Sequence, residues 1–168
     1  EYSVYRVKTG VWGDGQFISI DLNPANNQPG ILHYNAPEGK MEFTYRYSPE
    51  IGNKWASLLV DYNGHDVGFN SSLAVSNTNI PHISYFNSTF SSLKYARPFG
   101  PTAWWKWNIM GDPHSGLYSS IALYNSAIRI GAYDSTNSNL IQGMYGDRSG
   151  WEFQTIDGTY DKGEYVSL

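Results

Sequence analysis

Two short segments of the chain, SSLAV at 71–75 and SSIAL at 119–123, alternate between small and larger side chains. In each, the second serine and the alanine fall on one side of an extended chain, and the large aliphatic residues fall on the other. A period of two predicts a β-strand. The small-residue face permits close approach of another strand, as at the crowded centre of a β-propeller. A half-buried strand with a solvent-facing Ser/Ala side is the alternative interpretation.

These segments belong to a motif that recurs along the chain. Four glycines, Gly15, Gly68, Gly116 and Gly163, each open a copy and are separated by 53, 48 and 47 residues. Later in each full copy an aromatic residue stands seven positions before an apolar one, as in Tyr34 to Met41. The same spacing occurs from Phe86 to Leu93 and from Tyr133 to Leu140. A period of this length is typical of repeat architectures, propeller blades among them.

Each copy predicts the same four strands. In the first copy the strands are expected at 15–22, 31–35, 40–47 and 54–61, separated by turns rich in Pro, Gly and Asn. No segment shows helical periodicity above its strand pattern. The sequence therefore predicts an all-β fold of three four-stranded antiparallel meanders.

We divide the chain as one repeat domain, 1–168. Residues 1–14 match the closing strand of a partial repeat, and 163–168 the opening strand of another. The three full repeats are expected at 15–67, 68–115 and 116–162. Three blades do not close a propeller, which needs about four to eight. A fragment of a longer chain, two chains completing one ring, and a head-to-tail ring or filament are the open explanations. A β-trefoil, which also uses three four-stranded repeats, is the alternative fold.

The second repeat carries the motif Gly-x-x-Ser-Ser-Leu-Ala-Val from Gly68, then PHISYFN at 81–87, LKYA at 93–96 and a Trp. This pattern resembles the blade repeat of secreted bacterial and archaeal β-propeller proteins. The resemblance spans nearly all of 15–168 and is weakest in the first repeat. It implies a propeller blade and little about chemistry, because the function of such scaffolds lies in sites added to them.

A fainter similarity is to the fucose-binding propeller lectins. Arg129, in IRI at 128–130, resembles their sugar-contacting Arg, and Gly150-Trp151 resembles their Gly-Trp strand. Their acidic sugar ligand would fall near Gln142, which is not acidic. The other repeats have His82 and Gly30 in place of the Arg. The resemblance implies that only the third repeat could hold such a site.

Composition narrows the function classes. Aromatic residues make up 16% of the chain and charged residues only 15%, against a usual value of roughly 25%. The net charge is −4, so no basic surface for nucleic acid is expected. There is no cysteine, and no apolar run approaches the roughly 18 residues of a membrane span. The chain begins at Glu1 rather than Met, so we expect a processed or excised product, located outside the cell or at its surface.

The densest aromatic cluster is WWKW, which contains Trp104, Trp105 and Trp107. One of these should be a packing Trp equivalent to those of the other repeats, and the rest could stack against sugars or a partner chain. With Arg129, Gln142 and Trp151, they are the candidate ligand-binding residues. Asn87 and Asn70 begin glycosylation sequons, of which the one in the expected hairpin turn, Asn87, is the better candidate.

No catalytic or metal motif stands out. Asp61, Asp112 and Asp157 occur at corresponding places, one per repeat, so we predict that they cap turns rather than form an acid/base pair. The four histidines lack metal-ligand spacing, and neither a metal nor a cofactor is expected.

These features favour an extracellular structural or adhesive protein whose subunits, as a homo-oligomer or filament, complete one another's β-sheets. A lectin-like carbohydrate-binding module is the alternative, and a glycosidase the weaker one. The expected partners are therefore other copies of the chain and a glycan, with no nucleic acid and no membrane.

Overall fold

The computed structural model describes residues 14–48, 54–62, 64, 66–110, 115–125, 127–146, 150–159 and 165–168. Most of the predicted closing strand at 1–14, together with Asp112, lies outside these residues. The predicted strands of the first repeat are confirmed, with β1 at Asp14–Leu22, β2 at Pro29–Asn35, β3 at Lys40–Ser48 and β4 at Lys54–Asp61. A single 3₁₀ turn, η1 (Ala36–Glu38), connects β2 to β3.

The other two repeats form sheets of the same plan. The second sheet contains β5 (Val67–Val75), β6 (Pro81–Asn87), β7 (Ser92–Pro98) and β8 (Trp104–Met110). The third sheet contains β9 (Ser115–Tyr124), β10 (Ala127–Asp134), β11 (Asn139–Gly146) and β12 (Gly150–Asp157). In each sheet the strands are hydrogen-bonded in chain order and antiparallel.

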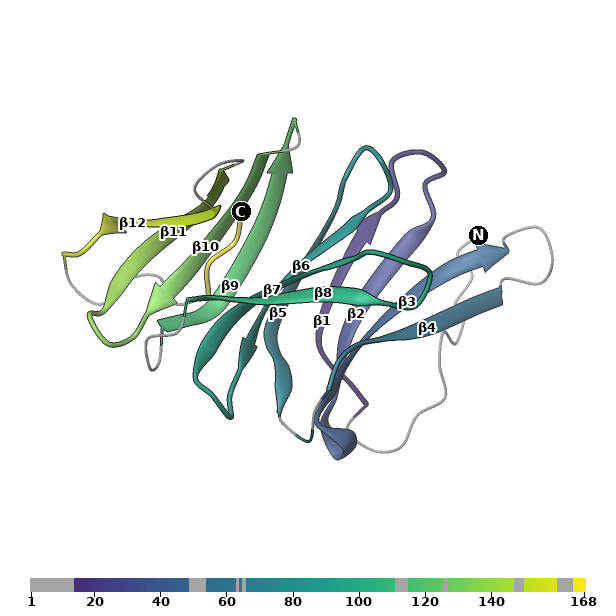
Figure 1. Ribbon diagram of the computed structural model, residues 1–168, viewed down its shortest axis with the longest axis horizontal. Helices are drawn as coiled ribbons and strands as arrows, with labels where there is room; N and C mark the ends of the chain where they lie inside the picture. The colour runs from purple at the N-terminus through teal and green to yellow at the C-terminus, as the bar shows by residue number, and fades with distance from the viewer. Residues whose placement is uncertain are drawn as a thin grey trace, which may run out of the picture.

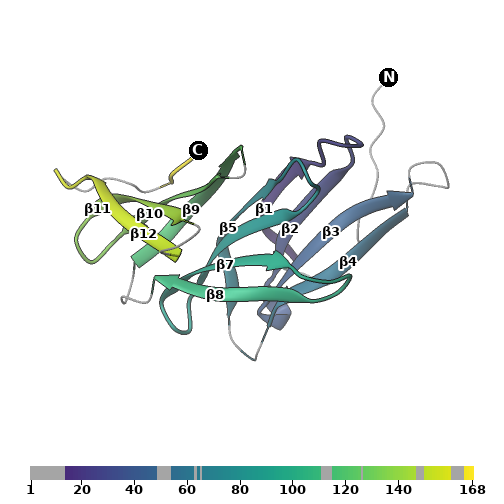
Figure 2. The same cartoon turned by 45° about the horizontal axis from the view of Figure 1, so that its top comes forward.

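The three sheets lie side by side in chain order (Figure 1). Among the described residues, 72% lie in strands, and their three sheets do not close into a barrel. The predicted all-β, propeller-like array of three four-stranded sheets is thereby confirmed. Figure 2 shows the sheets from another side, with β1 beside β5.

The first strands of the sheets, β1, β5 and β9, lie next to one another in that order. Gly15, Gly68 and Gly116 at their starts have φ angles of +88°, +110° and +97°, which only glycine adopts readily. Close approach also requires glycine at Gly116, because a Cβ there would lie 2.3 Å from Leu93 Cβ of the second sheet. At Gly68 and Gly116 the glycine is therefore a packing requirement of the junction with the preceding sheet, whereas a Cβ on Gly15 would meet no atom within 4 Å.

Each pair of adjacent sheets encloses its own hydrophobic core. The alternation of side chains across a strand sends one apolar set toward the preceding sheet and another toward the following one. The core between the first and second sheets contains Leu32, Met41, Phe43, Val60, Val67, Leu73, Ile83, Tyr85, Ala96 and Trp104. The core between the second and third contains Ala74, Leu93, Tyr95, Ile121, Ile128, Ile130, Ala132 and Ile141.

The last described residues, 165–168, form a turn and an irregular segment against the third sheet. The Leu168 N–H donates to Ser120 Oγ on β9 at 3.0 Å. Figure 1 shows this segment beside β9 and β10, in yellow. The division into repeats and partial repeats stays a prediction. Within the described parts of the chain, no helix has the length and apolar character needed to cross a membrane.

Candidate functional site

A cleft of about 330 Å³ opens between the second and third sheets. The turn between β5 and β6 forms one wall, and it is fixed by its own polar groups. The Ser76 hydroxyl accepts from the Ile80 N–H at 3.1 Å, and Asn79 adopts a positive φ of 64°. The lining residues are Val75, Ser76, Asn77, Thr78, Ile80, His82, Arg97, Leu123, Asn125, Ile128 and Tyr145.

His82 and Arg97 supply the ionisable groups of this cleft. The His82 Nδ1 lies 2.6 Å from the hydroxyl of Tyr95, and both side chains are buried. Burial, assisted by the positive charge of Arg97, lowers the pKa of His82 from 6.5 to about 4. The imidazole is therefore neutral at neutral pH, and Arg97 is the cation that the lining supplies.

Arg97 also connects the cleft to an exposed aromatic surface on β8. Its guanidinium lies 5.1 Å from the ring centre of Trp105 and 6.0 Å from that of Trp107. Phe99 stacks on Trp105 at 5.0 Å, and Tyr95 stacks on Trp107 at 5.6 Å. Trp105 and Trp107 remain 45% and 40% exposed, so part of each ring faces solvent. We name Phe99, Trp105 and Trp107 the aromatic platform.

Strand alternation separates the third tryptophan of the cluster from this platform. Trp104 points to the other side of β8 and is only 7% exposed, packed edge-on against Phe43 of the first sheet. It is the packing tryptophan of its repeat, paired in register with Pro98 as Trp151 is with Tyr145. The Trp151 ring lies 5.1 Å from that of Tyr95 of the second sheet, so it packs against the hydrophobic core between the second and third sheets.

Arg129 and Gln142 lie on the opposite face of the third sheet from Trp151. Register places Gln142 beside Gly131, two residues from Arg129 and on the same side. A Cβ on Gly131 would lie 2.7 Å from Val166, so this face points toward 165–168 rather than toward the second sheet. The structure therefore does not bring Arg129 and Gln142 together with Trp151.

The two sequon asparagines have different environments. Asn87 is the last residue of β6, is 3% exposed, and accepts from the Phe90 N–H at 3.1 Å. Asn70 lies in β5, is half-buried and has a positive φ of 48°. Their use as glycosylation sites stays a prediction.

A second cleft, of about 460 Å³, occupies the equivalent place between the first and second sheets. It is richer in aromatic and amide side chains than the one described above. Its lining includes Asn23, Asn26, Gln28, Phe43, Tyr45, Arg46, Tyr47, Asn79 and Trp104. Tyr47 is 55% exposed and packs edge-on against Tyr45. The repeat thus produces a cleft at each junction between sheets.

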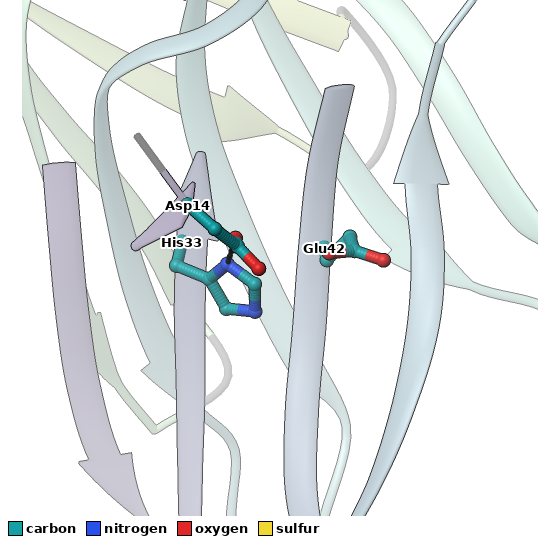
Figure 3. Close-up of side chains that lie close together, drawn as sticks. All are labelled: Asp14, His33 and Glu42. Atoms are coloured by element: carbon teal, nitrogen blue, oxygen red, sulfur yellow. Dashed lines mark ion pairs between the residues drawn. The ribbon is translucent and has the colours of Figure 1, made fainter. Parts of the chain in front are cut away.

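The described residues also contain a group of three potential metal ligands, Asp14, His33 and Glu42, whose ligand atoms lie within 4.8 Å of one another. Figure 3 shows them on three neighbouring strands, with the His33 Nδ1 paired to Asp14 Oδ1 at 3.2 Å. His33 Nε2 lies 3.1 Å from Thr44 Oγ1, so both ring nitrogens have protein neighbours. We interpret the group as a polar network that ties the strands of the first sheet together.

This network continues as a line of hydroxyls. Thr44 Oγ1 and Ser57 Oγ are 2.7 Å apart, which completes an acid, imidazole and hydroxyl series across the sheet. Thr44 is 1% exposed, so a substrate does not reach its hydroxyl. The equivalents of His33 in the other repeats are Tyr85 and Ala132, and this explains why no repeat pattern indicated the network.

Asp61 does not cap a turn as its sequence position predicted. It is 1% exposed at the first junction, where it accepts from the Tyr85 hydroxyl at 2.7 Å and pairs with Lys94 at 2.5 Å. Burial by itself raises the pKa of Asp61. The hydrogen bonds from Lys94 and Tyr85 and the charges of Lys94 and Lys106 outweigh burial, so the pKa lies below its usual 3.8. Asp157 does cap a turn, accepting from the Thr159 N–H at 2.8 Å.

The sequence indicated Trp105, Trp107 and Trp151 as candidate ligand-binding residues. It did not indicate Arg97 or the role of His82. A signal for His82 was present, because it stands where Arg129 stands in the third repeat. The missing information was the face on which each side chain lies and the sheet that it meets.

Comparison with solved structures finds a similar fold in a glycoside hydrolase of family GH43. That enzyme was engineered to display both endo-xylanase and exo-arabinofuranosidase activity. The TM-score is 0.57 at 11% identity, and the match covers 83% of this chain and 28% of the other. At this identity the likeness shows the fold alone, and GH43 enzymes are five-bladed propellers. The sequence matches no protein-family model and no curated protein. The resemblance to secreted propellers and fucose-binding lectins is therefore supported only at the level of a propeller-like fold.

Proposed function

We propose that the protein binds carbohydrate in the cleft between its second and third sheets, as an extracellular module. The observation that carries this proposal is the aromatic platform next to the guanidinium of Arg97, which lines the cleft. Sugars present C–H faces that pack on aromatic rings, and hydroxyls that bond to fixed polar groups. Trp105 and Trp107 offer the first kind of contact, and Arg97 offers the second.

Apart from Arg97, the described lining of the cleft is uncharged at neutral pH. His82 is uncharged at neutral pH because burial lowers its pKa to about 4. The remaining polar lining is amide and hydroxyl, from Asn77, Thr78, Asn125 and Tyr145. Such groups bind hydroxyls without requiring a charge on the ligand.

Binding is favoured over hydrolysis. Glycosidases generally place two carboxyl groups about 5 to 10 Å apart across the scissile bond. The described residues that line the two clefts include neither Asp nor Glu. The GH43 neighbour shows that a propeller can act on polysaccharides, and this supports carbohydrate as the ligand class of the proposal.

The test is a glycan array followed by calorimetric titration of the best saccharide. We expect replacement of Trp105 and Trp107 by Ala to weaken binding about tenfold or more, equivalent to ~1.4 kcal/mol or more. Both rings are partly exposed, so the fold should survive, and circular dichroism checks this. Phe90→Ala is the matched control, because Phe90 is 60% exposed but lies in the turn between β6 and β7. An array without hits, or equal affinity for the double variant, would refute the proposal.

A second candidate function is structural or adhesive, through assembly of subunits. It is favoured by the exposed aliphatic side chains of β1, since Ile18 and Ile20 are 64% and 62% exposed. Contiguous exposed apolar surface of this kind marks interaction sites. Native mass spectrometry of the whole protein tests for assembly, and a monomer at every concentration would count against this candidate.

A further inference from the structure

The two junctions between sheets use the same backbone contact. At the first, the Leu73 N–H on β5 donates to Ser19 Oγ on β1 at 3.0 Å. At the second, the Ile121 N–H on β9 donates to Ser72 Oγ on β5 at 3.1 Å. Each serine stands four residues after the glycine that opens its repeat, and each donor stands five residues after its own. At each junction the serine Oγ of one sheet therefore accepts the hydrogen bond, and the aliphatic residue of the next sheet donates it through its backbone N–H.

The C-terminal segment makes this contact a third time. The Leu168 N–H donates to Ser120 Oγ at 3.0 Å, and these residues hold the same two repeat positions. Tyr165 has a φ of +56°, as Tyr118 has +51° at the equivalent place in the third sheet. Val166 lies so close to Gly131 that any larger residue there would collide with it. Residues 165–168 thus occupy the place on the third sheet where a following sheet would begin.

On the first sheet, the aliphatic side chains that would pack against a preceding sheet are exposed. Ile18, Ile20 and Leu22 on β1 are 64%, 62% and 51% exposed. Their equivalents on β9 are Ser119, Ile121 and Leu123, of which Ile121 is 5% exposed and Leu123 packs against the second core. The same strand position is covered at both junctions inside the chain and open on β1. We name Ile18, Ile20 and Leu22 the head face, and the surface around Ser120 and Gly131 the tail face.

We propose that the head face of one copy docks on the tail face of a second copy, in the place that residues 165–168 fill within one chain. The tail face already receives a segment with this backbone contact, so it has the shape and the acceptor that the junction requires. The two faces differ, and the contact is therefore heterologous and adds subunits head to tail. This inference rests on the second candidate function and names its surfaces.

Residues 165–168 compete with the incoming head face, because both need Ser120 Oγ and the space over Gly131. The segment acts at high effective concentration, being attached to the sheet that it covers. Its removal should therefore strengthen association. Carbohydrate binding is independent of this contact, since the cleft lies between the second and third sheets.

Sedimentation equilibrium over a wide concentration range tests the proposal on the full chain, on a variant lacking 165–168, and on Ile20→Asp in both backgrounds. We expect removal of the segment to shift association to at least tenfold lower protein concentration, and Ile20→Asp to abolish it. Ile20 is exposed, so this substitution should not unfold the chain, and circular dichroism checks this. Phe90→Asp, at an exposed aromatic residue in a turn, is the matched control and should associate normally.

The outcomes distinguish the head-to-tail contact from assembly of subunits in general. If the full chain and the variant lacking 165–168 both stay monomeric at every concentration, the docking mode and the assembly function are both wrong. If the full chain associates but the variant lacking 165–168 does not, assembly stands and the docking mode is wrong. If the protein associates but Ile20→Asp associates equally well, assembly stands and the head-to-tail contact proposed here is wrong.

Discussion

The ion pair at the first junction gives the sharpest prediction about stability. Asp61 is 1% exposed and is contacted by Tyr85, Lys94 and, at 3.5 Å, Lys106. Asp61→Asn keeps the shape of the side chain and removes its charge, so two cations at this junction lose their counter-ion. Breaking a buried pair by removing one partner costs about 3 to 5 kcal/mol.

The lower end of that range applies here. Lys94 and Lys106 keep side-chain exposures of 14% and 33%, which lets both ammonium groups recover some solvation. We expect Asp61→Asn to lower the free energy of unfolding by about 3 kcal/mol, measured by equilibrium urea denaturation at neutral pH. For a chain of this size that loss corresponds to roughly 6 to 12 °C in Tm.

The matched control is Asp157→Asn at the equivalent place in the third sheet. Asp157 caps a turn and is only partly buried, so we expect a loss of about 1 kcal/mol or less. Equal losses for the two variants would refute the reasoning, because they would mean that the buried pair contributes no more than a turn cap.

The pH dependence provides an independent check. The pKa of Asp61 is lower in the folded state, so its contribution is fully present above the unfolded value near 3.8. That contribution is lost as the pH falls through the lower, folded value. The stability difference between the wild type and Asp61→Asn should therefore shrink as the pH falls below about 3.8. A difference that stays constant down to acidic pH would contradict this assignment.

Three further predictions concern packing and the cleft. Trp104→Ala removes a core side chain and should lower the free energy of unfolding by about 3 to 5 kcal/mol, measured by urea denaturation. Trp105→Ala should lower it by about 1 kcal/mol or less. Equal losses would contradict the faces of β8 assigned to the two residues. Gly116→Ala should destabilise the fold by about 3 kcal/mol or more, because the new Cβ collides with the second sheet. At Gly15 a Cβ meets no atom within 4 Å, so Gly15→Ala should cost only about 1 to 2 kcal/mol of backbone strain. Because the pKa of His82 falls from 6.5 to about 4 on folding, the unfolded state binds its proton first, and stability should decline between pH 6.5 and 4. His82→Gln should flatten that decline, and an unchanged profile would contradict it.

The repeat made most of the fold predictable. Every full copy repeats its glycine, its four-strand order and its turns, so each element was indicated three times. The first repeat is the least regular copy, yet its predicted strands at 31–35 and 40–47 differ from β2 and β3 by no more than two residues at any end. Regular spacing is enough to locate these strands, because side chains alternate with a period of two and the apolar pattern sets the strand register.

The candidate site was predictable only in part, because its chemistry lies between repeats. Trp105 and Trp107 were found by composition, but the partner Arg97 lies on a neighbouring strand and carries no pattern of its own. Asp61 looked like a turn cap because its position recurs as Asp157. Its real partners, Tyr85 and Lys94, belong to another sheet, and spacing along the chain does not report contacts across a junction.

The most direct test of carbohydrate binding is an NMR titration of the six tryptophan indole N–H signals with the saccharide that the array identifies. We predict that the Trp105 and Trp107 signals shift, while that of the buried Trp104 does not. Saturation with saccharide that leaves both platform signals unmoved would contradict it.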